Sequence, residues 1–263
     1  MTAMRLALFS DIHANLQALQ ACMAHAHAQG ATQLAFLGDL VGYGGSPSAV
    51  LDTVMQAVQD GAWAVRGNHD ELALHPPQQV QHTGEQGAQW THDQLAPVHA
   101  EFLDRLPLMA QHGSVLLVHA SAHQPARWPY VDNSIMAERS MTAAGDIDAR
   151  IRYVFSGHVH HPSLYYRTPT AKLMRFVPQP ACRFPCPHTG SGWRLWVPAA
   201  NRAMAMCAPY MPCTTTAPPP SPSTACRMTT PAPYKLCDAV ACPRPLRCAW
   251  SKAYEKTTPR HRD

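Results

Sequence analysis

Short apolar segments alternate with helical segments over the first two thirds of the chain, and this alternation restricts the fold more than any other feature. Met4–Ser10, Gln33–Leu37 and Ala62–Val65 are short and rich in apolar residues, and stretches with helical spacing separate them. Such an alternation favours a largely parallel sheet with helices on its faces. Ligands of these sheets bind beyond the carboxyl ends of the strands.

The helices between these strands have recognisable starts. Asn15–Gln29 is predicted to be a helix, because Asn15 can cap its start and Gly30 can end it. Ser46 and Pro47 predict the start of a second helix, since Ser caps well and Pro suits a first turn. One helical stretch around Pro97 and three further strands complete the predicted elements: Gly84–Asp104, Ser114–Val118, Arg152–Phe155 and Leu173–Val177.

The composition changes near Val177. Residues 1–177 contain 10 Lys+Arg and 14 Asp+Glu, a net charge of −4, whereas residues 178–263 contain 11 and 3, a net charge of +8. Eight of the nine cysteines and 16 of the 25 prolines follow Val177. We therefore expect one domain over residues 1–177, incomplete at its C-terminal end, and a largely irregular, disordered or out-of-frame Pro- and Cys-rich tail over residues 178–263.

The tail carries no recognisable binding motif. Its cysteines form no Cys-x-x-Cys pair and have no histidine at zinc-finger spacing, so we expect no zinc site there. Its basic residues lack interleaved aromatic motifs, so specific nucleic-acid binding is not expected.

Five polar clusters each follow a predicted strand. They are Asp11-Ile12-His13, Gly38-Asp39, Gly67-Asn68-His69-Asp70, His119 and Gly157-His158-Val159-His160. One such cluster says little by itself, because Asp-x-His or a lone His after a strand arises often by chance. All five in succession, each at a strand end, predict one shared ligand site at the carboxyl edge of the sheet.

The residue types in these clusters suit metal ions. Carboxylate and imidazole ligands favour Mn, Fe, Zn or Ni, and the absence of cysteine from the clusters disfavours a thiolate site. A carboxylate can bridge two ions because it has two oxygens. Two ions about 3.5–4 Å apart can activate a shared hydroxide and clamp a phosphoryl group.

The motif order resembles that of the calcineurin-like metallophosphoesterase superfamily. The strings SDIHANLQAL, LGDLVGYG, VRGNHD, VHAS and SGHVHHP carry the resemblance, which covers Met4 to Val177. Within the superfamily, they are most similar to small bacterial phosphodiesterases described as YfcE-like or diadenosine-tetraphosphatase-like. The resemblance implies an α/β fold of four layers, a β-sandwich with flanking helices (α/β/β/α), with the metal site at the strand C-terminal ends.

The resemblance also implies a role for each site residue. It assigns three ligands to each of two divalent ions and one ligand to both: Asp11, His13 and His160 for the first ion, Asn68, His119 and His158 for the second, and Asp39 as the bridge. His69 is expected to act as a general acid or to position the phosphate, and Asp70 to orient His69. Manganese is the metal expected first, with Fe, Zn or Ni as alternatives.

The expected activity is hydrolysis of phosphate esters, in particular phosphodiesters of nucleotide type, by a hydroxide that bridges the two metal ions. The expected partner is therefore a small phosphate-ester substrate, whereas its identity and the oligomeric state stay open. A protein Ser/Thr phosphatase shares these motifs and is one alternative. A non-catalytic scaffold of the same fold is another, but such proteins usually lose ligands, and all seven are present here.

Four residues outside the ligand set leave two interpretations each. Arg66 adjoins the third cluster and contacts either the phosphate or an acidic partner. Trp128 and Tyr130 line a substrate cleft, where they stack on a nucleobase, or pack under a loop. Tyr43 leaves the same two interpretations, substrate contact or packing under a loop, and it lies close to Asp39 in the sequence.

The tail suggests a shifted reading frame. Relatives of this branch continue with a stretch resembling V-G-S-V-G-Q-P-R-D-G, and the chain contains no such stretch. Residues 192–213 (GWRLWVPAANRAMAMCAPYMPC), back-translated and read two nucleotides later, permit Gln-Pro-Arg-Asp directly before a glycine. The hypothesis is that the tail is out of frame relative to the family.

No segment predicts a membrane location. The chain has no run of about 18 apolar residues, the length that a membrane-spanning helix needs. Met1–Ser10 carries one positive charge and runs directly into a strand pattern, so we expect no signal peptide and a cytoplasmic protein.

Overall fold

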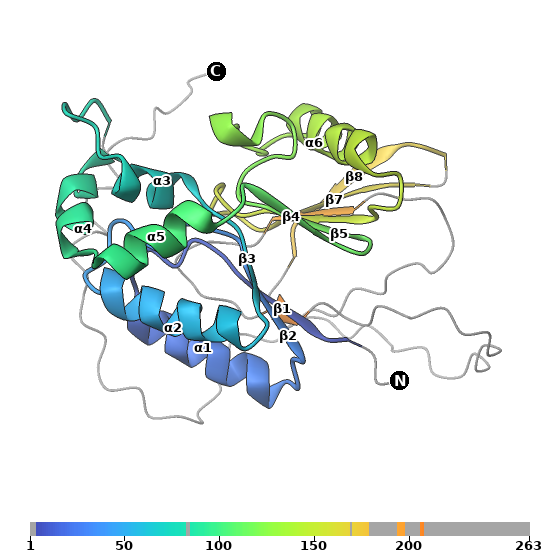
Figure 1. Cartoon of the computed structure of the whole chain (residues 1–263). Coiled ribbons are helices and arrows are strands. Elements are labelled where there is room, and N and C mark those ends of the chain that lie inside the picture. Colours follow the sequence, from blue (N-terminus) through green and yellow to red (C-terminus); the bar gives the residue numbers. More distant parts are fainter. Residues whose placement is uncertain (1–3, 83–84, 169, 179–193, 198–205, 208–263) are drawn as a thin grey trace, which may run out of the picture. The chain divides into compact units, whose positions relative to one another are not determined.

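Two β-sheets pack face to face between layers of helices in the computed structural model of the chain (Figure 1). The structure describes residues 4–82, 85–168, 170–178, 194–197 and 206–207. The chain's contacts separate Met1–Thr215 from Thr216–Asp263, and both sheets belong to the first unit.

The first sheet is the one that the strand and helix alternation predicted. Its strands run in the order β10-β1-β2-β3, with β1, β2 and β3 parallel. The bounds of the strands are β1 Leu6–Phe9, β2 Gln33–Phe36, β3 Trp63–Ala64 and β10 Met206–Cys207. Helices α1 (Leu16–Ala28) and α2 (Pro47–Gln59) connect the parallel strands and cover the outer face of this sheet (Figure 1).

Both helix starts lie where the sequence predicted them. The side chain of Asn15 accepts a hydrogen bond from the backbone N–H of Ala18 at 3.0 Å, which satisfies one free donor of the first turn. Helix α1 ends shortly before Gly30, whose φ of 73° is easily adopted only by glycine. Pro47 occupies the first position of α2.

The second sheet is mixed, so the largely parallel sheet that the alternation favours is found only in the first. Two packed sheets with helices outside them confirm the β-sandwich that the resemblance implied. The strand order of the second sheet is β4-β5-β6-β9-β7-β8, and only β5–β6 and β6–β9 are parallel pairs. The bounds of the strands are β4 Met109–His112, β5 Val115–Val118, β6 Tyr153–Phe155, β7 Ser163–Arg167, β8 Leu173–Phe176 and β9 Arg194–Val197. Only Gly113 and Ser114 separate β4 from β5, so these strands are antiparallel, because so short a link cannot make a crossover.

The remaining helices lie beside the two sheets. Their bounds are α3 Asn68–Leu74, α4 Ala88–Gln94, α5 Pro97–Arg105 and α6 Ser134–Ile147. The predicted helical stretch 84–104 is thus divided in two. Ala96 takes an extended conformation (φ −69°, ψ 156°), because the ring of the following Pro97 disfavours the helical one. Helix α6 covers the second sheet, and it was not predicted.

The predicted boundary at Val177 leaves out two strands. Strand β9 pairs with β6 on one side and with β7 on the other, and β10 pairs with β1. The backbone of residues 194–197 therefore completes the second sheet, so a short part of the stretch predicted to be largely irregular forms a strand. The other predictions for the tail, including those for its cysteines and prolines, concern residues outside the described part of the chain.

Alternating side chains of the strands build two layers of the core. Leu6 and Leu8 of β1 face the second sheet, where they join Leu117 and Phe155 in one buried cluster. Ala7 and Phe9 point the opposite way, into the cluster formed with α1, α2 and α5. A strand buried on both faces must be apolar throughout. The packed sheets hold the carboxyl ends of β1, β2, β5 and β6 in fixed positions.

Candidate metal centre

The structure brings together all seven residues that the sequence predicts to bind metal. They follow five strands: Asp11 and His13 after β1, Asp39 after β2, Asn68 after β3 as the first residue of α3, His119 after β5, and His158 and His160 after β6. Their meeting follows from the parallel direction of these strands within each sheet and from the packing of the two sheets.

Four of these residues form the first cluster. The Nε2 atom of His160 lies 3.3 Å from Asp11 Oδ1 and 3.3 Å from His13 Nε2. His13 Nε2 is 3.8 Å from Asp39 Oδ2. One donor atom from each of the four side chains lies within 4.8 Å of the others, a geometry that a single cation can fill.

The second cluster shares Asp39 with the first. His119 Nε2 lies 3.2 Å from Asp39 Oδ2 and 3.0 Å from Asn68 Oδ1. Asp39, His119 and His158 each place one donor atom within 4.8 Å of the other two. One carboxylate thus faces two groups of imidazoles, which is the arrangement that a bridging ligand needs.

The residues present fit two cations. Asp11 and Asp39 are carboxylates with 2 % and 1 % of their surface exposed, and a buried negative charge is costly unless a cation balances it. The Nε2 atom of His158 is buried and has no hydrogen-bond partner in the described part of the chain. Such an atom is explained by an ion that it would bind.

Hydrogen bonds leave one ring nitrogen of two histidines free for metal. The Nδ1 atom of His119 lies 2.7 Å from the carbonyl oxygen of Leu37, and that of His13 lies 3.3 Å from the carbonyl oxygen of Val41. Donation from Nδ1 fixes the tautomer whose Nε2 carries a lone pair. In both rings Nε2 is the atom that points into the cluster.

Burial and neighbouring charges shift the pKa of the central groups in opposite directions. Burial acts to raise the pKa of Asp39, but His119 and the other imidazoles outweigh it and hold that pKa below its usual range. Burial acts to lower the pKa of His119, yet Asp39 raises it to about 9. Without a cation, the two residues therefore form an ion pair, and metal binding would release the proton of His119.

Positive φ angles are frequent among the candidate ligands. Five of the seven candidate ligands have a positive φ: Asp11 54°, His13 49°, Asp39 51°, His158 68° and His160 60°. Such conformations cost on the order of 1 kcal/mol each and persist only where surrounding contacts impose them. Here the His13 N–H donates to the Asp39 carbonyl at 2.9 Å, and the His158 N–H donates to Asp11 Oδ1 at 3.0 Å.

Two glycines allow the loops to approach one another. A Cβ atom on Gly67 would lie 2.2 Å from the backbone nitrogen of Asp39, and one on Gly157 would lie 1.8 Å from Ser10 Oγ. Ser10 donates a hydrogen bond to Asp11 Oδ2 at 2.5 Å, a contact that the sequence analysis missed. The glycines in the GNHD and GHVH motifs are therefore needed for space.

His69 lies at the edge of the first cluster. Its backbone N–H donates to Asp39 Oδ1 at 2.8 Å, while its ring packs 5.0 Å from the His13 ring and 4.5 Å from the Tyr43 ring. Burial lowers the pKa of His69 to about 4, against the opposing effect of Asp39. The ring is therefore neutral at pH 7 and keeps one N–H that can donate a hydrogen bond.

Asp70 does not contact the ring of His69 as expected. Its carboxylate accepts hydrogen bonds from three backbone N–H groups: those of Leu40 at 2.8 Å, Val41 at 3.1 Å and Gly67 at 2.9 Å. These bonds tie the loop after β2 to the loop after β3. Burial and the nearby Asp39 raise the pKa of Asp70 to about 7. Its side chain therefore positions backbone rather than an imidazole.

Arg66 forms ion pairs with acidic neighbours. Its Nε lies 3.3 Å from Glu71 Oε2, and its Nη1 lies 3.5 Å from Asp104 Oδ1. Of the two interpretations of Arg66, these contacts favour the ion pair over contact with a phosphate.

Three aromatic side chains surround the clustered histidines. The Tyr130 ring stacks on His158 with centroids 4.0 Å apart, and the Trp128 ring meets His119 edge-on at 5.8 Å. The Tyr43 ring packs 4.8 Å from His13. The sequence named all three as candidates for substrate contact, but it did not indicate that they touch the candidate ligands.

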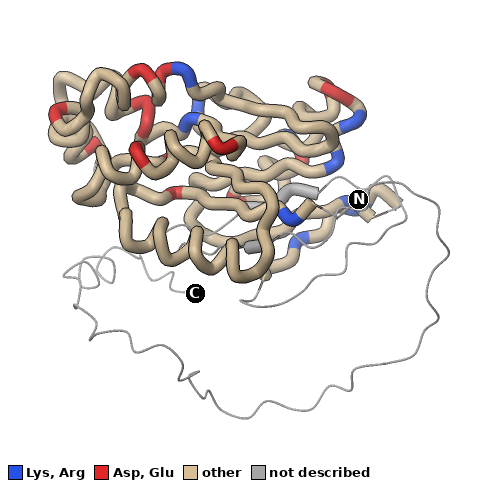
Figure 2. Tube along the Cα trace, turned by 60° about the horizontal axis from the view of Figure 1, so that its bottom comes forward, with Lys and Arg blue, Asp and Glu red and all other residues tan. Residues whose placement is uncertain are grey.

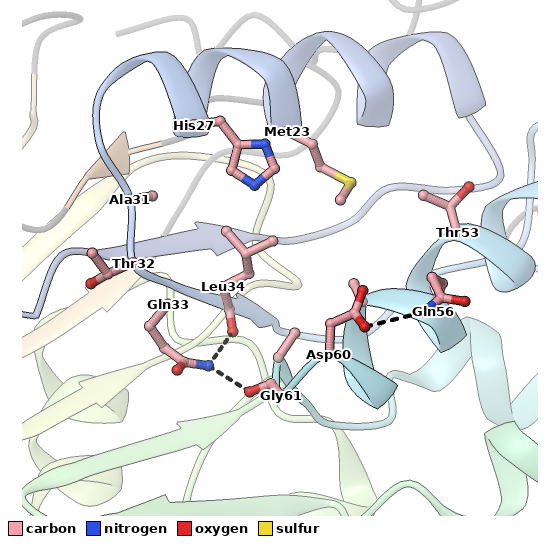
Figure 3. Close-up of a pocket in the computed structure, with 12 residues that line it drawn as sticks. Met23, His27, Ala31, Thr32, Gln33, Leu34, Thr53, Gln56, Asp60 and Gly61 are labelled. Atoms are coloured by element: carbon pink, nitrogen blue, oxygen red, sulfur yellow. Dashed lines mark hydrogen bonds between the residues drawn. The ribbon is translucent and has the colours of Figure 1, made fainter.

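A cavity of about 420 Å³ lies away from the candidate metal centre (Figure 3). Side chains of α1, β2 and α2 line it, among them Met23, His27, Gln33 and Asp60. Gln33 is the first residue of β2, so the cavity adjoins the amino end of that strand, whereas Asp39 follows its carboxyl end. It therefore belongs to the opposite edge of the first sheet.

The charged residues are unevenly distributed over the chain. Figure 2 shows many of the Asp and Glu residues near the end of the molecule that carries α3 and α4, whereas most described Lys and Arg residues lie toward the other end. None of the helices in the described ranges is long and apolar enough to cross a membrane.

Comparison with known proteins identifies a family model that matches residues 4–178, described as the calcineurin-like phosphoesterase superfamily domain. An uncharacterized protein of Methanocaldococcus jannaschii is 29 % identical over 164 residues, which are 60 % of this chain and 63 % of that protein. The chain thus matches less than two thirds of the length of this relative.

Two solved structures resemble the chain over most of its described part. A metallophosphoesterase from Sphaerobacter thermophilus has a TM-score of 0.61 and 29 % identity, covering 76 % of this chain and 77 % of that one. The hypothetical protein PH1004 from Pyrococcus horikoshii has a TM-score of 0.54 and 16 % identity, with coverages of 75 % and 77 %. The second likeness shows the fold alone.

Proposed function

The chain belongs to the calcineurin-like phosphoesterase superfamily, and we propose that it is a metal-dependent hydrolase of phosphate esters, in particular phosphodiesters. The observation that carries this proposal is the pair of histidine clusters that share the carboxylate of Asp39. A single shared carboxylate between two sets of nitrogen and oxygen donors suits two divalent ions. Scaffold proteins of the same fold have no need for such a set.

We assign Asp11, His13 and His160 to the first ion, Asn68, His119 and His158 to the second, and Asp39 to both. The oxygen and imidazole donors suit Mn²⁺ first, with Fe, Zn and Ni as alternatives. Two bound ions supply a nucleophile from water at neutral pH and neutralise charge on the phosphoryl oxygens.

The protein's own groups set the geometry of the reaction. Asp39 and Asp70 fix the loops after β2 and β3 through their bonds to backbone N–H groups. His69 lies in the first turn of α3 and is neutral at pH 7, so its N–H donates a hydrogen bond to the leaving oxygen. Arg66 forms ion pairs with Glu71 and Asp104. The negative charge of the phosphate would therefore be balanced by the metal ions and not by Arg66.

The test is hydrolysis of bis(p-nitrophenyl) phosphate by the metal-free protein, with and without added Mn²⁺. Metal-dependent release of p-nitrophenolate is expected, together with its loss in Asp39→Asn. The variant His25→Ala changes an exposed histidine of α1 and serves as the control that retains activity. Absence of turnover in a soluble protein that binds two ions per chain would instead support a non-catalytic scaffold.

The role of His69 is tested separately with two leaving groups. His69→Ala is expected to lose about 100-fold in turnover of an alkyl phosphodiester, and much less with p-nitrophenolate, which needs little help to leave. Rates are compared for both esters at saturating Mn²⁺, with metal content measured in parallel. Full turnover of the alkyl ester by a metal-loaded His69→Ala protein would remove this role.

A further inference from the structure

Two half-exposed tyrosines lie beside the candidate metal centre. Tyr43 is 49 % exposed and Tyr130 is 57 % exposed, although both rings pack against buried histidines. Large aromatic rings stabilise a protein chiefly when they are buried, so rings that are left open beside a ligand site indicate a group that covers them.

Tyr130 is held by its stacking on a candidate ligand. Its ring lies nearly parallel to the His158 ring, with centroids 4.0 Å apart and planes inclined by 21°. Two residues earlier, the Trp128 ring meets the ring of another candidate ligand, His119, with centroids 5.8 Å apart. Trp128 has a φ of 51°, a conformation that a bulky residue rarely adopts. The loop is thus constrained at both Trp128 and Tyr130.

Tyr43 is held on the other side by a second strained loop. Its φ is 58°, between Gly42 with a φ of 88° and Gly44, where a Cβ would lie 2.1 Å from the His13 carbonyl oxygen. This backbone places the Tyr43 ring 4.8 Å from the His13 ring and 4.5 Å from the His69 ring. A tyrosine with a strained backbone whose ring packs on two site residues indicates a function at the site.

The two tyrosines therefore pack against different clusters of the candidate metal centre. Tyr43 packs on His13 of the first cluster, whereas Tyr130 packs on His158 of the second. A phosphoryl group bound between the clusters would thus lie beside both rings, and a substituent on that phosphate would pass next to them.

Resting on the proposed function, we propose that Tyr43 and Tyr130 bind the planar base of a nucleoside phosphate substrate. A nucleobase offers a flat π-face that stacks on tyrosine, and stacking would cover the ring surface that is now exposed. Sugar phosphates and alkyl phosphates have no such face. The two rings thus give nucleotides a higher affinity than other phosphate esters that bind at the metal centre.

The test is the affinity of the Mn²⁺-loaded full-length protein for AMP and for ribose 5-phosphate, measured by isothermal titration calorimetry. The two ligands carry the same phosphate and sugar, so the ratio of their Kd values reports the base alone. Because both ligands use the same metal contacts, a disturbed metal centre weakens both and leaves the ratio in place. We expect AMP to bind at least about fivefold more tightly.

Variants of the two tyrosines then locate the base. Tyr43→Leu and Tyr130→Leu should each reduce the Kd ratio about twofold or more, which is the lower limit for one aromatic pair, and the double variant should bring it near one. Tyr43→Phe and Tyr130→Phe keep the ring and should keep the ratio. Trp90→Leu, which removes a 47 % exposed aromatic ring of α4, is the matched control and should also keep it.

Three outcomes would overturn the inference: equal affinities for AMP and ribose 5-phosphate, no measurable binding of AMP, or a ratio that both Leu variants leave unchanged. Failure of the proposed function is distinguishable from these, because bis(p-nitrophenyl) phosphate would then resist hydrolysis whatever the base preference. Conversely, metal-dependent hydrolysis of that ester with equal affinities for the two ligands would remove the base site alone.

Discussion

At the scale of single residues, the candidate site depends on contacts that are closer than ordinary packing. One carboxylate oxygen of Asp39 accepts a hydrogen bond from the backbone N–H of His69, and the other oxygen lies near His13 and His119. Gly157 leaves space for Ser10 and Asp11, which touch each other. Small changes at these positions should therefore have large effects.

Asp39→Asn is expected to lose both metal ions, because it replaces the one carboxylate that both clusters share with a neutral and poorer ligand. Metal content per chain is measured by mass spectrometry after desalting, with Asp60→Asn, an exposed position at the end of α2, as control. A normal content of two ions in Asp39→Asn would contradict the bridging role.

Gly157→Ala should destabilise the fold and weaken the binding of the first metal ion. Its Cβ would lie 1.8 Å from Ser10 Oγ and 2.5 Å from Asp11 Oδ2, so the loop after β6 must move. Overpacking of this kind costs about 1–3 kcal/mol in the free energy of unfolding. Urea denaturation measures the loss, and Gly45→Ala is the control, because nothing lies within 4 Å of a Cβ there. Equal free energies of unfolding for the two variants would show that the loop after β6 accommodates the added methyl group without cost.

At the scale of elements, the helix starts show what local sequence can specify. Asn15 caps α1 as predicted, whereas Asn133 caps α6 without having been noticed. The side chain of Asn133 accepts hydrogen bonds from the N–H groups of Ile135 and Met136, both at 3.0 Å. Helix α6 covers the second sheet through Ala137, Met141 and Ala144.

Asn133→Ala should lower the free energy of unfolding by about 1 kcal/mol, the usual effect of removing a side-chain cap. Ser134→Ala, one position further on and equally exposed, is the control and should change stability little. Both values come from urea unfolding followed by circular dichroism. A loss in Ser134→Ala as large as that in Asn133→Ala would argue against the cap as the cause.

At the scale of the whole molecule, strand β9 decides where the domain ends. It pairs with β6 and β7, so a chain that stops at Val177 leaves both strands with unpaired edges. We expect a 1–177 protein to aggregate, since exposed edges pair with other chains, and a 1–215 protein to be monodisperse. Size-exclusion chromatography and thermal unfolding compare the two, and a 1–177 protein as soluble and stable as the longer one would show that β9 is dispensable.

The hypothesis of a shifted reading frame applies to the same region. It concerns residues that lie mostly outside the described part of the chain, apart from the backbone of 194–197 and 206–207. Sequencing the gene across codons 175–200 tests it directly. An intact frame without similarity in the shifted frame would end the hypothesis.

The sequence by itself determined the three parallel strands of the first sheet, the starts of α1 and α2, and the polar clusters that gather at the centre. These features follow from local patterns: apolar runs, caps, and polar clusters at strand ends. The parallel direction of neighbouring strands then brings the clusters to one edge. For that reason the polar clusters could be placed at one edge, and the resemblance to the family then named the seven candidate ligands among them.

Only the tertiary structure decided which distant groups touch. The bonds from Leu40 and Val41 to Asp70, the stacking of Tyr130 on His158, and the place of β9 between β6 and β7 join residues far apart in the chain. Local periodicity specifies which face of an element is apolar, but it does not specify the partner. That choice depends on how both sheets pack together, because only the assembled core fixes the loops that meet above it.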